Sequence, residues 1–150
     1  MRSISGRLAA AALVGSLVLG WNARIAPNVV SAQARRTITV TRIYTGPDGQ
    51  SHAEETDMAL NGGVSEMMKA AGVQFSRRAP TPTSNEWHPG PRRQYVITLS
   101  GRAEIEVAQG KKVAVGPGHI NLIEDTTGKG HITRNLGPDD RIVVTIPLAN

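Results

Sequence analysis

The chain has 150 residues, no cysteine and a formal net charge of +5. The length suffices for one domain, and the absence of cysteine excludes both disulfides and thiolate metal ligands. Three of the arginines lie within the first 34 residues, so residues 35–150 carry a net charge of only about +2. This small charge is evenly spread and is accompanied by few aromatic residues, which excludes a nucleic-acid-binding surface.

The N-terminal segment has the pattern of a secretory signal peptide. Two arginines begin it, and an uninterrupted apolar run follows at residues 8–19. That run is shorter than the roughly 20 residues that a membrane-spanning helix needs. An Ala-Gln-Ala cleavage site ends at Ala34. We predict that residues 1–34 are removed, leaving no membrane span, and that the protein is exported to the periplasm or the extracellular medium. An uncleaved N-terminal anchor is the alternative.

Residues 35–150 are rich in glycine and proline, and their apolar runs are short. This pattern predicts one all-β domain, with a short helical turn over residues 64–71 as the exception. In residues 102–108, strict alternation directs Ala103, Ile105 and Val107 to one face and charged residues to the other, as in a half-buried antiparallel strand. The predicted strands cover residues 37–44, 51–60, 73–77, 92–99, 102–108, 111–115, 119–123, 131–134 and 141–146. Short strands at this spacing indicate a sandwich or a jelly-roll barrel.

Two of the four histidines are the candidates for chemistry. His88 ends a proline-rich connector just before the strand at residues 92–99, and His131 follows a glycine-rich loop. The two are far apart in the sequence, so only a barrel or a sandwich would bring them together.

The spacing around these histidines resembles the two motifs of the cupin superfamily. In the first motif, His88 is followed at the expected spacing by Gln94 and Gly101. In the second, His131 and Asn135 have the expected three residues between them. The resemblance implies that His88 and His131 meet inside a cupin-type jelly roll.

The chain departs from the motifs at several positions. Gly90 stands in place of the second histidine, Gln94 in place of the glutamate, and Glu124 in place of a proline, and the loop before His131 is longer than usual. These departures remove one imidazole and one negative charge from the usual ligand set.

Two longer segments are similar to a group of small single-domain, RmlC-like cupins. They are WHPGPRRQY at residues 87–95 and EDTTGKGH at residues 124–131, and the resemblance covers roughly residues 38–146. It implies a fold more firmly than a reaction. Because many small cupins pair through their sheets, it also implies a homodimer.

The resemblance further implies a pocket inside the barrel. In cupins the position of Gln94 points inward, and alternation then directs Val96 and Thr98 inward, with Trp87 as a wall. Cupins commonly hold Fe, Mn, Ni or Zn with three histidines and a carboxylate. The candidate ligands for such a divalent metal are His88, Gln94 and His131.

Three further polar residues are candidates for the pocket. Glu124 and Asp125 could supply the missing negative charge, orient an imidazole or bond their own loop backbone. Arg92 could clamp a carboxylate or a phosphate, because a guanidinium fork matches such groups. An arginine at a strand edge is more often solvated or salt-bridged.

Three functional hypotheses stay open at this point. The first is a metal-dependent enzyme acting on a small polar metabolite, with His88 or His131 as metal ligand or general base. The second is a metal-free, non-catalytic module that binds a small polar or anionic ligand. The third is a structural scaffold without a ligand.

Overall fold

The computed structural model describes residues 37–80 and 85–149, which belong to one compact unit spanning residues 34–150. The described residues form strands and one short 3-10 turn, η1 (Ala108–Gly110), so the all-β prediction is confirmed. The predicted signal peptide lies outside the described residues. No helix within the two described ranges is long and apolar enough to cross a membrane. The strands are β1 (Ile38–Thr45), β2 (Ser51–Met58), β3 (Leu60–Asn61), β4 (Val64–Ser65), β5 (Gln74–Arg78), β6 (Gln94–Ser100), β7 (Arg102–Glu106), β8 (Lys112–Val115), β9 (Ile120–Glu124), β10 (Ile132–Leu136) and β11 (Arg141–Pro147).

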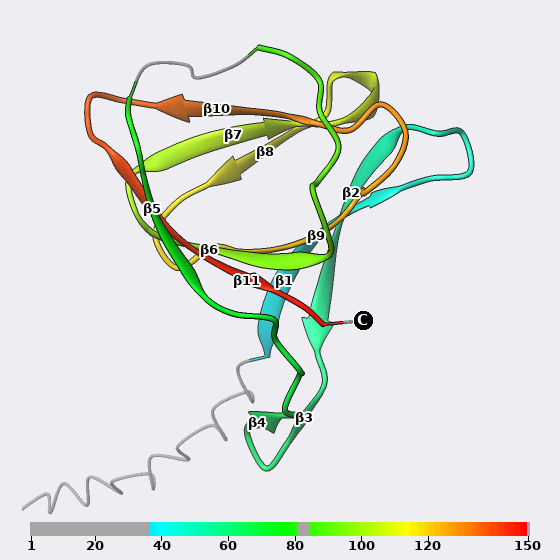
Figure 1. Ribbon diagram of the computed structural model, residues 1–150, viewed down its shortest axis with the longest axis vertical. Coiled ribbons are helices and arrows are strands. Elements are labelled where there is room, and N and C mark those ends of the chain that lie inside the picture. The colour runs from blue at the N-terminus through cyan, green and yellow to red at the C-terminus, as the bar shows by residue number, and fades with distance from the viewer. Residues whose placement is uncertain (1–36, 81–84, 150) are drawn as a thin grey trace, which may run out of the picture. The chain divides into compact units, whose positions relative to one another are not determined.

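The strands form two main sheets that face one another (Figure 1). The larger sheet has six strands in the order β2-β1-β9-β6-β11-β5, and the smaller has three in the order β10-β7-β8. Neighbouring strands are antiparallel, except that β1 and β9 are parallel. Within the described part of the chain, no ladder of hydrogen bonds joins the two sheets into a closed barrel.

The core between the sheets follows from the alternation of side chains along the strands. In β7, Ala103 and Ile105 are 1% and 3% exposed, and Val107 after it is 1% exposed, as the pattern predicts. These side chains pack with Ile43 of β1 and Ile123 of β9. Apolar residues from both sheets therefore meet in one cluster, which fixes the spacing between the sheets.

The predicted helical turn over residues 64–71 is wrong. Gly62 and Gly63 adopt positive φ angles of 62° and 89°, and this tight turn pairs the short strands β3 and β4. Val64 and Met67 are 70% and 99% exposed. A short helix there would bury no apolar face, and short helices depend on such packing.

Candidate functional site

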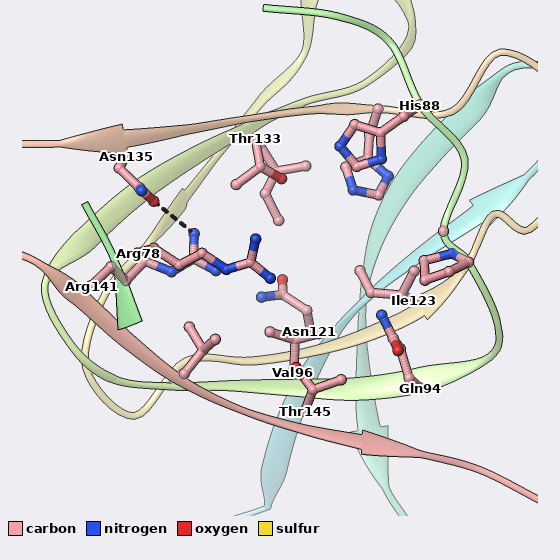
Figure 2. Close-up of a pocket in the computed structure, with 15 residues that line it drawn as sticks. Arg78, His88, Gln94, Val96, Asn121, Ile123, Thr133, Asn135, Arg141 and Thr145 are labelled. Carbon is pink, nitrogen blue, oxygen red and sulfur yellow. Dashed lines mark hydrogen bonds between the residues drawn. The ribbon is translucent and has the colours of Figure 1, made fainter. Parts of the chain in front are cut away.

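A cavity of about 370 Å³ lies between the two sheets (Figure 2). The larger sheet contributes side chains from β5, β6, β9 and β11, and the smaller contributes side chains from β7 and β10. Val96, Ile105, Ile123 and Val143 give it apolar surface, and the other side chains that line it are mostly polar. Its size is typical of a site for a small molecule.

The structure brings His88 and His131 together at one end of this cavity. Their backbones form an isolated β-bridge, in which each N–H donates to the carbonyl of the other at 3.0 Å. The two rings lie 4.8 Å apart between centroids, tilted by 58°. Gln94 and Val96 line the same cavity.

Gly130 permits this close approach of the two histidines. Its φ angle is +79°, and a Cβ atom on it would lie 2.0 Å from the carbonyl carbon and oxygen of His88. Any side chain at this position would therefore push apart the backbones that the bridge joins.

His131 is held by a buried carboxylate. Its side chain is 6% exposed, and its Nδ1 atom lies 2.6 Å from Oδ2 of Asp125, which is fully buried. Ser51 Oγ donates to the same oxygen at 2.6 Å. A carboxylate accepts hydrogen bonds, so Nδ1 carries the proton in this contact, and in the neutral imidazole Nε2 is the nitrogen with a free lone pair. Asp125 thus orients the imidazole, which is one of the three roles considered for it. Ser51 was not among the predicted residues.

Glu124 does not lie on the cavity. It follows Ile123 on β9, and alternation turns it to the other face of the larger sheet, where it pairs with Arg42 at 2.6 Å and Arg93 at 2.5 Å. Burial alone would raise the pKa of Glu124, but the hydrogen bonds from the two arginines hold that pKa below its ordinary value. Glu124 therefore belongs to an ion-pair cluster on the outer face.

Three other predicted pocket residues also lie away from the cavity. Trp87 packs under Lys129, whose Nζ atom is 3.8 Å from the centre of the indole ring, so it forms no pocket wall. Arg92 is exposed to solvent in the segment before β6. Thr98 points inward with Gln94 and Val96, as alternation requires, but it is fully buried beyond the reach of the cavity.

Two arginines that the sequence analysis missed line the cavity instead. Arg78 ends β5 and Arg141 begins β11, and the two are direct partners across the antiparallel ladder. Arg141 is 5% exposed; its desolvation, together with the charge of Arg78, lowers its pKa to about 10. Alternation along β11 could have identified Arg141 from the sequence. Arg141 lies on the same face of the strand as the buried residues Val143 and Thr145.

Asn121 is a third polar residue that was missed. It lies on β9 and lines the cavity, and only 1% of it is exposed. Neither its Nδ2 nor its Oδ1 atom has a hydrogen-bond partner among the described residues. A buried amide without partners is costly unless something else occupies the cavity beside it.

The candidate metal ligands do not make a complete metal site. Two imidazoles and the neutral amide of Gln94 supply no negative charge, and the cavity lining includes two guanidinium groups and no carboxylate. Across residues 37–80 and 85–149, no three His, Cys, Asp or Glu side chains are grouped so that they could hold a metal ion. The residues present therefore do not fit a divalent cation, which the guanidinium charges would repel.

Comparisons with known proteins identify no family for this chain. No family model matches it, and no curated protein matches it. The structure of protein NMB1881 from Neisseria meningitidis is similar at 18% sequence identity and a TM-score of 0.41. The match covers 56% of this chain and 81% of that chain.

Proposed function

We propose that this chain is an exported, cupin-type protein that binds a small polar metabolite in the cavity between its sheets. We propose further that His131 acts on the bound molecule as a general base. One observation carries the proposal: a buried imidazole, oriented by a fully buried carboxylate, lines a cavity of small-molecule size.

The geometry around His131 suits proton transfer. Asp125 accepts the hydrogen bond from Nδ1, so Nε2 is the atom that would take a proton from the ligand. The carboxylate would then stabilise the imidazolium that forms, and the hydroxyl of Ser51 would keep that carboxylate in place. His88 is exposed and stands beside His131, where its ring would contact the ligand at the opening of the cavity.

The cupin-type jelly roll is supported by two facing sheets and by the two motif histidines at one end of the cavity between them. We propose export on the basis of the N-terminal pattern, and a homodimer on the basis of the resemblance to small cupins. We propose metal-independent action because the cavity carries two positive side chains and no carboxylate. A metal-dependent enzyme using His88, Gln94 and His131 is the competing hypothesis.

The test is a thermal-shift screen of small polar metabolites against the protein recovered after export, with parallel elemental analysis. We expect at least one metabolite to raise the Tm in a metal-free preparation, because it binds the native state alone. If a compound that binds is also converted, its turnover should be lost in the His131→Asn and Asp125→Asn variants. His52→Gln is the control, since His52 lies on β2 away from the cavity and pairs with Asp48. The metal-independent proposal would be refuted if the protein contained stoichiometric Fe, Mn, Ni or Zn and the His131→Asn variant did not.

A further inference from the structure

We infer that the end of the cavity away from the histidines is an anion-binding site, where Arg78 and Arg141 hold a carboxylate or phosphate group of the ligand. The inference rests on the proposed function, in that the cavity is the ligand site, and it adds the chemical class of the ligand.

The first observation is the register of the two arginines. Arg78 and Arg141 are opposite one another on β5 and β11, so their side chains leave the same face of the sheet. Both line the cavity, and Figure 2 shows both extending toward Asn121. Like charges directly opposite one another destabilise a strand pair, and an anion bound between them would remove that repulsion.

The second observation is the absence of an internal counter-ion. Within the described ranges, neither Arg78 nor Arg141 forms an ion pair. The Nη1 atom of Arg141 donates to Asn135 over a long 3.4 Å contact, and its buried Nε atom has no partner. Four other arginines, by contrast, are matched to carboxylates of the protein: Arg42, Arg77, Arg93 and Arg134.

The third observation is a set of amides around the pair. The unpartnered, 1% exposed side chain of Asn121 shares the cavity with both guanidinium groups, and its Nδ2 atom can donate to an oxyanion. Asn135 accepts from Arg141 and donates to the carbonyl of Ala79 at 2.7 Å, next to Arg78. Asn135 is thus a positioning residue that ties the two arginines' strands together.

These donors define the ligand class. Guanidinium forks match the oxygen geometry of carboxylates and phosphates, and hydrogen bonds between charged groups are the stronger kind. The cavity of about 370 Å³ is much larger than a free anion and extends to His131 at its other end. The ligand is therefore a small molecule whose anionic group sits between the arginines while its reacting part reaches His131.

The test measures the affinity of the full exported protein for inorganic phosphate and for succinate, with potassium chloride at matched ionic strength as reference. We expect one or both anions to raise the Tm above the chloride value. We expect three substitutions each to lower the affinity for that anion about tenfold or more: Arg78→Gln, Arg141→Gln and Asn121→Ala. Arg92→Gln is the matched control: it removes an exposed arginine off the cavity and should leave the affinity unchanged. A preference for phosphate or for succinate identifies which anionic group the natural ligand carries.

The inference is overturned if neither anion raises the Tm, or if Arg92→Gln weakens binding as much as Arg78→Gln does. If Arg141→Gln fails to fold, the anion affinity of Arg78→Gln is the test, because Arg78 is exposed and its substitution leaves no buried void. Anion binding that persists in His131→Asn supports the site even where the general-base proposal fails. Stabilisation by neutral metabolites alone, unchanged in Arg78→Gln, overturns the anion site and leaves the proposed cavity function intact.

Discussion

Replacing Arg141 by methionine should stabilise the ligand-free protein, although most buried substitutions destabilise. Burial and the nearby charge of Arg78 lower the pKa of Arg141 by more than two units to about 10, and the guanidinium is still charged at pH 7. One pKa unit corresponds to about 1.4 kcal/mol, so carrying this charge in the folded state costs on the order of 3 kcal/mol. Methionine keeps the unbranched stem of the side chain and removes both the charge and the unpartnered Nε atom.

The gain is reduced by the loss of the contact with Asn135, which at 3.4 Å contributes at most about 1 kcal/mol. Arg141→Met should therefore raise the free energy of unfolding by about 1 to 2 kcal/mol in a chloride buffer free of phosphate and carboxylates. The assay is urea unfolding at pH 7, comparing midpoints at equal slope. A saturating anion should reverse the order of the two proteins. Arg141→Met that destabilises the protein by more than about 1 kcal/mol in chloride would refute the view that this charge lacks a partner.

Three further outcomes are expected. Gly130→Ala should lower the free energy of unfolding by about 2 kcal/mol or more, because its Cβ would strike the backbone of His88 and its φ is positive; calorimetry that shows no loss would contradict this. Glu124→Gln should lower the free energy of unfolding by only about 1 kcal/mol at pH 7, because the two arginines are partly exposed and water screens their ion pairs with Glu124. The depressed pKa of Glu124 means that its contribution is fully present above its ordinary value of 4.5 and is lost as the pH falls below it, so acid unfolding curves of the two proteins should converge. Asp125→Asn should lower kcat on any substrate found by at least about tenfold with little change in KM, because the amide can donate to His131 and stabilise the wrong tautomer; unchanged kcat would remove His131 from the chemistry.

The strands were predictable because their side chains alternate and their turns contain glycine. Strand β7 shows this well: Ala103, Ile105 and Val107 are buried, and their charged neighbours are not. The cupin resemblance implied the inward direction of Gln94, and the inward direction of Val96 then followed from the same period of two. The prediction of a helical turn around Val64 was wrong because these residues suit either a helix or a hairpin. Two preceding glycines with positive φ angles favour the hairpin.

The site was only partly predictable because it depends on which strands pair. The meeting of His88 and His131 could be expected from motif spacing alone. The Arg78–Arg141 pair requires knowledge that β5 joins the edge of the sheet beside β11, in the one register that sets the two arginines opposite each other. Arg92 was considered, and the other two were not, because it stands next to a recognisable motif. Alternation along β11 places Arg141 on the buried face but does not identify its partner.

The most direct measurement is an NMR titration of the nitrogen-15-labelled protein with phosphate and with succinate, following three side-chain signals. We expect the signals of the Asn121 Nδ2 amide and the Arg141 Nε–H to shift together and to saturate at one ligand concentration, because both residues line the cavity and neither atom has a partner among the described residues. Shifts confined to Arg92, with the Asn121 and Arg141 signals unmoved at saturation, would show that the anion binds the outer surface and that the cavity is not its site.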